Sequence, residues 1–492
     1  MNPEVVFRNG EAVPLRSIPA LDISTFRNEL ISATARNGQR IAALFGQRLS
    51  PERARLYALL ADDNKHLLRP LLSEVEATYH ALTPDCTQAH LFEREIFEQV
   101  GVHPEGHPWL KPLRLGHTPE GGRPHPFFSM AGEEVHEVAV GPVHAGVIEP
   151  GHFRFQCHGE VVDHLEIHLG YQHRGAEEAL AGGPHRRTMV QMETIAGDTT
   201  IAYATAYCQV MEALGAVQAP PRAQALRAIA LELERLANHV GDMGALANDV
   251  GFLPTAAFCG RLRGDFLNMT ALVCGSRFGR GLVRPGGVAF DIDNGMAKDL
   301  LQRLTAAERD VASAIKLFFS TRSVIERLAG AGHVSREACL DLGIVGLAAR
   351  ASGLARDTRA DHPWGLYRTA PLPVSTWPTG DVYARAKVRH LEIQHSIAFL
   401  REQLERLPGG PFRQACPPPA PEMLTASLVE GWRGEVLHVA ITDSQGHFAR
   451  YKLKDPSFHN WAALALALRG QQISDFPLCN KSFNLSYCGF DL

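Results

Sequence analysis

The clearest amphipathic pattern in the chain runs from Arg222 to about Val240. One face of this stretch carries apolar side chains at helical spacing, at Ala223, Leu226, Ile229, Ala230, Leu233 and Leu236. Pro220-Pro221 stands just before it, where proline starts a helix well. Similar patterns predict helices at 261–275, 296–318 and 380–406. Long helices therefore dominate the later part of the chain.

Strand-like alternation flanks this helical region on both sides. It appears at 135–140 and 153–167, joined by a loop over Gly141–Gly151, and again as a hairpin at 435–441 and 449–453. Upstream, short apolar segments between Phe26 and Leu72 alternate with polar turns, and helical spacing follows at His90–Val100. A stretch rich in glycine, proline and histidine, Gly116–Pro126, is typical of a linker.

These patterns predict an α+β fold in three parts. A loose amino-terminal arm would occupy residues 1–22, a small α+β domain with its linker 23–130, and a mainly α-helical domain 131–492. We expect the large domain to carry a β hairpin near each of its ends. The length of 492 residues is ample for two or more domains.

Composition excludes several classes of function. The formal net charge of −4 gives no general basic surface, so we expect no nucleic-acid partner. The nine cysteines are scattered and no two have the C-x-x-C spacing, which favours buried thiols in a reducing compartment over disulfides or a zinc knuckle. The amino terminus has no secretory pattern, and no apolar run is long enough to span a bilayer. At a membrane, other subunits would have to hold this chain in place.

Two short motifs carry side chains capable of redox or proton chemistry. His144 and His152 lie on the glycine-containing loop between the predicted strands, where imidazole could donate to a carbonyl or carry a proton. Exposed loop histidines without function are the alternative. Arg174, followed by Glu177, could raise the potential of a nearby redox centre, or form a surface salt bridge.

Two further motifs are open to structural interpretations. His239 lies three residues beyond Leu236 on the apolar helix face, a position more typical of a core histidine than of a functional one. Arg350, followed by Asp357, is consistent with a turn fixed by hydrogen bonds. The sequence contains no nucleophile elbow, phosphate loop or dinucleotide fingerprint.

Taken together and in order, the motifs resemble those of a known family. The segments that carry the resemblance are Gly141-Pro142-Val143-His144, Glu149 to Arg154, His173 to Glu177, Pro220 to Ala223, Arg350 to Gly353, Gly380 to Val382 and Asp455 to Phe458. They resemble the large subunit of energy-converting, formate hydrogenlyase type, nickel-iron hydrogenases and the quinone-site subunit of respiratory complex I. Leu91 to Glu98 with Gly106 to Leu110 resembles the small hydrophilic complex I subunit, here fused upstream.

The resemblance implies a subunit of an oxidoreductase complex related to complex I. The chain would pack against an iron–sulfur partner subunit whose 4Fe-4S cluster delivers electrons, on the cytoplasmic face of the inner membrane beside antiporter-like membrane subunits. Arg174 matches an arginine close to that cluster, and His239 a histidine thought to couple cluster reduction to protonation. His152 matches the loop histidine that meets the quinone. This chain itself is expected to bind no cofactor, with a quinone as candidate acceptor.

The departures from the family pattern are as informative as the matches. The four metal-binding thiolates fall on Ala196, Thr199, Ser486 and Gly489, which cannot hold nickel and iron. The tyrosine that bonds the quinone in complex I falls on Gly197, and Tyr203, further along the same segment, is a candidate substitute. We therefore expect a metal-free, hydrogenase-related branch, inactive as a hydrogenase, with the old metal cavity empty or repurposed.

Three hypotheses follow. In the first, the chain is a redox subunit that passes electrons from the partner cluster to a quinone or another acceptor. In the second, it is a non-catalytic subunit that docks the cluster protein onto an ion-translocating membrane arm. In the third, weaker one, histidines form a new metal site, since the chain has 23 of them.

Overall fold

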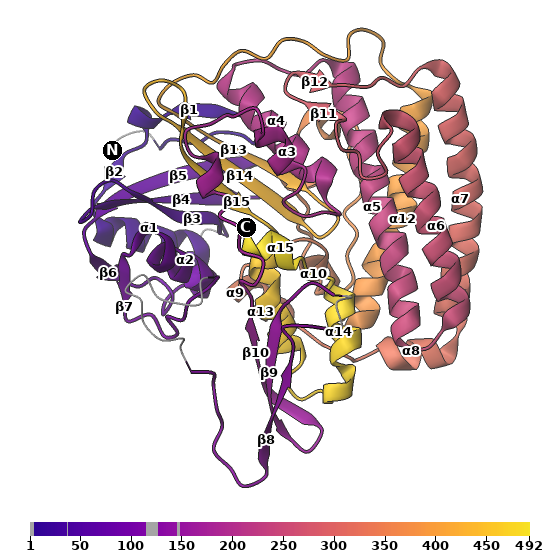
Figure 1. Ribbon diagram of the computed structural model, residues 1–492, viewed down its shortest axis with the longest axis horizontal. Coiled ribbons are helices and arrows are strands. Elements are labelled where there is room, and N and C mark those ends of the chain that lie inside the picture. Colours follow the sequence, from indigo (N-terminus) through magenta and orange to yellow (C-terminus); the bar gives the residue numbers. More distant parts are fainter. Residues whose placement is uncertain (1–3, 37, 115–125, 145–147) are drawn as a thin grey trace.

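The computed structural model describes residues 4–36, 38–114, 126–144 and 148–492. Three layers follow one another across the molecule: an amino-terminal sheet, a carboxy-terminal sheet, and a bundle of long helices (Figure 1). Helices and separate small sheets together confirm the predicted α+β class. Within the described residues, no helix is both long and apolar enough to cross a bilayer.

The amino-terminal layer is a four-stranded sheet in the order β2-β5-β4-β3, covered by two helices. Its strands are β2 (Ala20–Leu21), β3 (Arg40–Arg48), β4 (Ala54–Asp62) and β5 (Leu67–Val75), and its helices are α1 (Ile23–Arg36) and α2 (His90–Val100). The short strands β6 (Thr78–His80) and β7 (His103–Glu105) pair beside it. The short apolar segments predicted between Phe26 and Leu72 include β3, β4 and β5.

The carboxy-terminal sheet lies face to face with the amino-terminal one. Its order is β1-β13-β14-β15, with strands β1 (Ala12–Pro14), β13 (Met423–Glu430), β14 (Glu435–Thr442) and β15 (Phe448–Lys454). Side chains from both sheets, including Phe45, Tyr57, Leu428 and Val439, form one buried apolar cluster. The predicted 435–453 hairpin is present, and β13 extends it.

The prediction of a loose arm over residues 1–22 is wrong for its described part. Strand β1 pairs with β13, β2 pairs with β5, and Phe7 is 3% exposed. The buried side chain of Asn9 donates to the carbonyls of His362 and Leu428. The sequence pattern is too short to reveal this, because the arm is held by partners about 400 residues away in the chain.

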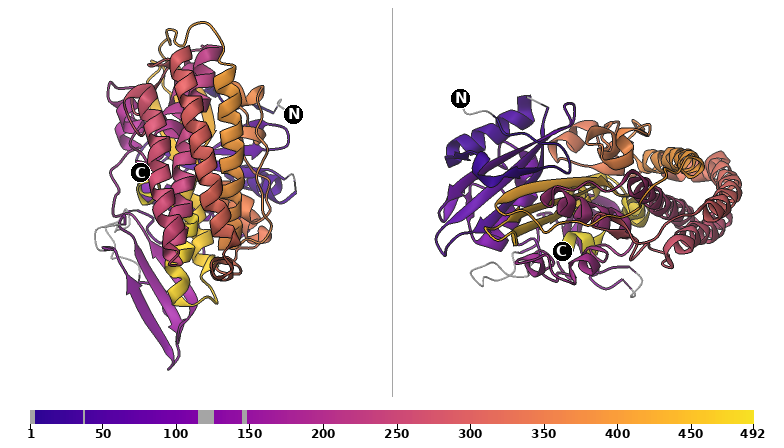
Figure 2. Two further views of the ribbon diagram at one scale, coloured as in Figure 1. Left: turned by 90° about the vertical axis from the view of Figure 1, so that its right-hand side faces the viewer. Right: turned by 90° about the horizontal axis from the view of Figure 1, so that it is seen from above.

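The bundle consists of α5 (Pro221–Asp249), α6 (Leu253–Cys274), α7 (Asn294–Ser320) and α12 (Val382–Glu405). These helices run side by side in both views that show them lengthwise (Figure 1 and Figure 2). Helix α5 extends nine residues beyond the predicted end at Val240. Glycines interrupt the apolar pattern there, but Gly244 has a packing role: a Cβ on it would lie 2.9 Å from Cβ of Cys259 on α6.

The remaining elements connect these layers. A three-stranded antiparallel sheet, β8 (Val135–Val140), β9 (His152–His158) and β10 (Val161–His168), projects from the body (Figure 2). The predicted strand 153–167 is thus two strands that turn at Gly159. Shorter elements are α3 (Thr188–Met192), α4 (Thr200–Leu214), β11 (Val283–Arg284), β12 (Gly287–Val288), α8 (Arg322–Leu328), α9 (Arg336–Asp341), α10 (Gly346–Ala351), α11 (Thr358–Asp361), α13 (Ser457–Ala467), α14 (Phe476–Phe483) and α15 (Tyr487–Asp491). The predicted linker 116–126 lies outside the described residues except for Pro126.

A buried ion pair joins the two stacked sheets. Arg40 on β3 binds both carboxylate oxygens of Glu435 on β14, at 3.1 and 2.5 Å, and its Nε donates to Asp63. Lys454 adds a third contact to Glu435 at 3.1 Å. Burial raises the pKa of Glu435, but Arg40 and Lys454 outweigh it and hold the pKa to about 2. Glu435 therefore stays ionised inside the protein.

We predict that Arg40→Met lowers the free energy of unfolding by about 3–5 kcal/mol, because it leaves buried carboxylates under-compensated. Chemical denaturation monitored by circular dichroism measures the change. The matched variant Arg53→Met removes an arginine whose side chain is 59% exposed beside Glu74, and should cost less than about 1 kcal/mol. Equal losses in the two variants would contradict this interpretation.

The same pair predicts a pH dependence of stability. The folded pKa of Glu435, about 2, lies below its ordinary value of 4.5, so the unfolded chain binds the proton more readily. The stabilisation from Glu435 is therefore complete at a pH above its ordinary pKa. It is lost as the pH falls toward the pKa of Glu435 in the folded protein. Denaturation of wild type and Arg40→Met across acid pH should show the two curves converging as the pH falls.

Candidate functional site

The structure brings together the two segments that hold the lost metal-ligand positions. Ala196 and Thr199 lie just before α4, and Ser486 and Gly489 lie at the start of and within α15; all four are buried. Arg174 spans the two segments, donating to the carbonyls of Cys488 at 3.2 Å and Ile195 at 2.9 Å. Hydrogen bonds from one side chain to the backbone thus join the two segments that four metal-binding thiolates would otherwise join.

A second arginine, Arg433, makes a parallel connection. It lies in the turn between β13 and β14 and binds Asp198 in a bidentate pair, at 2.6 and 2.8 Å. Its Nε donates to the carbonyl of Asn484 at 2.5 Å, and Nη1 lies 3.3 Å from the hydroxyl of Thr199. The neighbouring Trp432 donates to the carbonyl of Asp198 and stacks beneath the guanidinium. Asp198 and Arg433 were not predicted as site residues.

At Gly489 the expected chamber is filled by protein. A Cβ there would lie 2.5 Å from Oδ2 of Asp455 and 2.8 Å from the hydroxyl oxygen of Ser486. That hydroxyl accepts a hydrogen bond from the backbone amide of Gly489 and so caps the amino-terminal end of α15. Of the two expected alternatives, an empty or a repurposed cavity, the first does not describe this position, because a carboxylate and a cap occupy the space that a side chain would need.

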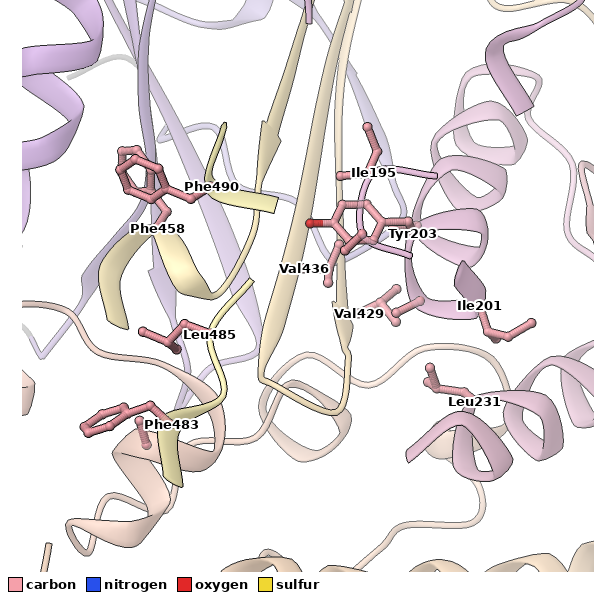
Figure 3. Close-up of a cluster of buried hydrophobic side chains, with 14 of the residues drawn as sticks. Ile195, Ile201, Tyr203, Leu231, Val429, Val436, Phe458, Phe483, Leu485 and Phe490 are labelled. Carbon is pink, nitrogen blue, oxygen red and sulfur yellow. The ribbon is translucent and has the colours of Figure 1, made fainter. Parts of the chain in front are cut away.

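Tyr203 is the partner of this carboxylate. Its hydroxyl donates to Asp455 at 2.5 Å, and Figure 3 shows the oxygen directed away from α4 within the buried cluster. Burial and the charge of Asp455 hold the pKa of Tyr203 well above its ordinary value, so the phenol stays protonated. Because its single donor is already used, Tyr203 is not free to replace the tyrosine expected at Gly197. A Cβ on Gly197, by contrast, would meet nothing within 4 Å.

The histidine loop lies against the same tail. His144 donates from Nε2 to the carbonyl of Gly151 at 2.9 Å, and His152 donates from Nδ1 to the carbonyl of Gly141 at 3.1 Å. Gly141, with φ at +83°, leaves no room for a Cβ, which would lie 2.1 Å from the carbonyl oxygen of Gly151. A Cβ on Gly151 would in turn lie 2.6 Å from the ring of Tyr487. The loop, the tail and Arg174 therefore form one continuous region.

The tail also carries a free cysteine. Burial, followed by the nearby Glu149, raises the pKa of the Cys488 thiol to about 11. It remains a protonated thiol at neutral pH, which makes it a poor metal ligand and a poor nucleophile. Among the residues that the structure describes, no three histidine, cysteine, aspartate or glutamate side chains converge as a metal site requires. The histidine-metal hypothesis gains no support from this part of the chain.

His239 lies inside the protein rather than on its surface. Its ring is fully buried, and Nε2 lies 2.7 Å from Oε2 of Glu392 on α12. Burial lowers the pKa of His239, although the hydrogen bond to Glu392 acts in the opposite direction. The ring packs edge-on against Trp432 at 6.3 Å, so it is linked through Trp432 to Asp198.

Glu392 belongs to a buried ionic cluster that also contains Arg350 and Asp357. The members are the carboxylates of Glu232, Asp357, Glu392 and Glu430 and the guanidiniums of Arg235, Arg350 and Arg359. The cluster thus has one more acid than base. Burial raises the pKa of Glu430, and Arg350 only partly counters this, so Glu430 is the member best able to hold a proton. The predicted hydrogen-bonded turn is part of this larger network.

Glu177 connects the site to the amino-terminal domain. It accepts from Lys452 at 2.8 Å, from Arg450 at 2.8 Å and from the amide of Leu453. Lys452 also binds Glu95 on α2. Burial opposes the charge of Glu177, but Lys452 and Arg450 hold its pKa below the ordinary range. Its contacts anchor the segment that presents Arg174.

The site therefore contains most of the predicted residues, together with several that sequence reasoning missed. Arg174, His144, His152, Gly197 and the four lost ligand positions lie in one region, with Tyr203 beneath it. The missed residues are Asp198, Glu392, Trp432, Arg433 and Asp455. Two of these carried a signal: Asp198 lies between two lost ligand positions, and Asp455 opens a family motif.

Comparisons with known proteins agree with this architecture. A family model described as the 49 kDa subunit of the respiratory-chain NADH dehydrogenase matches residues 249–425 and 413–491. One described as the 30 kDa subunit matches residues 30–129. Formate hydrogenlyase subunit 5 of Escherichia coli is 30% identical over 484 residues, 92% of this chain and 84% of the relative.

Two further relatives span the hydrogenases and the NADH dehydrogenases. Hydrogenase-4 component G of Escherichia coli is 28% identical, over 86% of this chain and 77% of its own length. NADH-quinone oxidoreductase subunit 4 of Thermus thermophilus is 29% identical, over 70% of this chain and 90% of its own length.

Fold, site and relatives define a subunit of the hydrogenase and NADH dehydrogenase type, with both hydrophilic complex I domains in one chain. The chain belongs to the family that contains formate hydrogenlyase subunit 5 and the 49 kDa subunit of respiratory NADH dehydrogenase. The predicted resemblance is confirmed. The domain boundary at residue 130 stays a prediction.

The packing at Gly489 leads to a test with a matched control. We predict that Gly489→Ala lowers the free energy of unfolding by about 1–3 kcal/mol, because the new Cβ collides with Asp455. Gly197→Ala introduces the same methyl group into open space and should change stability by less than about 0.5 kcal/mol. Thermal and chemical denaturation measure both. A tolerated Gly489→Ala would show that the space at the old ligand position is not filled.

Proposed function

We propose that this chain is a subunit of a membrane-associated oxidoreductase, held at the cytoplasmic face of the inner membrane by antiporter-like partner subunits. It would accept electrons from a 4Fe-4S cluster in a partner iron–sulfur subunit and pass them to a quinone or another acceptor. The observation that carries the proposal is the placement of Arg174, an exposed cation fixed by two backbone carbonyls.

Arg174 has the properties needed to tune an adjacent redox centre. Its side chain is exposed and has no ion pair to a carboxylate within the described part of the chain. The two hydrogen bonds hold the guanidinium in place without neutralising its charge. A fixed positive charge stabilises the reduced form of a neighbouring cluster, whose potential depends on local charge and hydrogen bonding.

The surface around Arg174 supports docking of a partner. Exposed apolar side chains lie on the neighbouring segments, with Val143 79%, Val190 59% and Tyr171 47% exposed. Arg187 adds a positive charge on the same segment as Val190. Large exposed apolar side chains mixed with arginine are typical of interface surfaces.

His152 has the arrangement needed to bind a reduced quinone. Because Nδ1 donates to the carbonyl of Gly141, the neutral ring presents Nε2 as an acceptor. Nε2 is buried and has no partner among the described residues. It could accept a hydrogen bond from a quinol hydroxyl, or donate to a quinone carbonyl once the ring carries a second proton. The open space at Gly197 leaves room for a headgroup near the tail, in place of the tyrosine side chain.

The proposal predicts that Arg174→Met lowers the reduction potential of the partner cluster by on the order of tens of millivolts, because a nearby positive charge is lost. Redox titration of the purified complex, followed by electron paramagnetic resonance, measures the potential. Arg309→Met, at a side chain 79% exposed on α7, is the matched control and should leave it unchanged. His239→Met should flatten the pH dependence of the same potential. Unaltered potential and pH dependence in both variants would contradict the redox role.

A second candidate function is non-catalytic, with the chain docking the cluster subunit onto the membrane arm. The filled position at Gly489 and the engaged Tyr203 favour it, since they remove two parts of the ancestral active site. This function predicts that a quinone analogue carrying a photoreactive group fails to label the His152 loop in the complex. Labelling that His152→Ala abolishes would exclude the non-catalytic function.

A further inference from the structure

A separate cavity of about 720 Å³ lies where the amino-terminal domain meets the projecting sheet and the carboxy-terminal helices. Its walls come from α2, the segment after β7, strand β10, and helices α13 and α15. The volume is within the range of small-molecule sites, roughly 300–1,000 Å³. Neither Arg174 nor His152 lines it.

The lining is predominantly apolar and aromatic. Side chains on opposite walls include Leu91, Trp109, Phe127, Leu165, Trp461 and Phe490. Trp109 remains 40% exposed at the surface, although its ring stacks with His164 at 6.0 Å. Such a lining favours the apolar body of a ligand over water.

The charges on the wall do not balance. Lys111 pairs with Glu166 at 2.7 Å, and these two charges compensate each other. Arg94 has no such partner in the described ranges. Its Nε and Nη2 donate to the carbonyls of Lys111 and Pro112, both at 2.8 Å, which fixes the guanidinium plane and leaves Nη1 without an acceptor among the described residues.

A second polar group beside Arg94, on His90, also has an unused hydrogen-bonding atom among the described residues. Nε2 of His90 is buried and has no partner among the described residues. Burial, followed by the charge of Arg94, lowers the pKa of His90 to about 3, so the ring is neutral and adds no charge of its own. Burial also lowers the pKa of Arg94 to about 10, although the charges of Glu98 and Glu166 act in the opposite direction. A lowered pKa of this kind is expected for an under-compensated cation.

We propose that this cavity is a binding site for an amphipathic monocarboxylate of the fatty-acid type. The carboxylate would bind Nη1 of Arg94 next to His90, and the hydrocarbon chain would lie against the aromatic walls. Charge-assisted bonds from a pre-fixed guanidinium favour a carboxylate over a neutral head. The site is independent of the proposed redox function.

Quenching of tryptophan fluorescence by a dibrominated stearate tests this in the full-length protein. Bromine quenches on contact, and two of the five tryptophans, Trp109 and Trp461, line the cavity. We expect saturable quenching by the acid and at least about tenfold weaker binding of its methyl ester. Equal affinity for acid and ester, or no saturable quenching by the acid, would overturn the proposal.

Two variants locate the binding. Arg94→Gln should weaken binding of the brominated acid about tenfold or more. Ala465→Phe fills the cavity from α13 and removes no hydrogen bond, so it should abolish the quenching. This second variant tests the site even if Arg94→Gln does not fold. Arg309→Gln, at a side chain 79% exposed on α7, is the control and should bind as wild type. Unchanged affinity in Ala465→Phe, or in a folded Arg94→Gln, would overturn the site assignment.

Discussion

Two guanidiniums hold the centre of this molecule together. Arg174 and Arg433 each bind both the segment before α4 and the carboxy-terminal tail. In the tail, Arg174 binds Cys488 and Arg433 binds Asn484. In a nickel-iron enzyme the same two segments would be cross-linked by thiolates on a metal pair. Ionic and backbone hydrogen bonds connect them here, and the position of Gly489 is closed by Asp455 and the Ser486 cap. The tail is thus fixed by the chain's own side chains.

The buried charges behind this centre give it a capacity for protons. The ionic cluster between α5, α10, α12 and β13 contains one more carboxylate than guanidinium, and His239 donates a hydrogen bond to the carboxylate of Glu392, one of its members. A buried group with an unbalanced charge binds or releases a proton when charge changes nearby. Such a network suits the proposed role, in which a neighbouring cluster gains and loses electrons.

Sequence reasoning located long-period features and missed those made by distant contacts. Helices α5, α6, α7 and α12 and the strands flanking them follow from periodicity, and the family motifs identified the Arg174 and histidine-loop region. The arm was misjudged because β1 is stabilised by β13, which local sequence does not reveal. Asp455 and Arg433 were missed for the same reason: their roles exist only once Gly489 and Asp198 are placed beside them. A missing thiolate is visible in sequence, but what fills its place depends on packing.

The pairing of β1 with β13 also governs when the chain can finish folding. Residues 12–14 leave the ribosome long before their strand partners at 423–425 are made. Until then the amino-terminal domain exposes the apolar face that later covers the second sheet. Contacts of such high sequence separation are slow to form. During the synthesis of the intervening residues, the nascent chain therefore carries an uncovered surface that a chaperone could recognise.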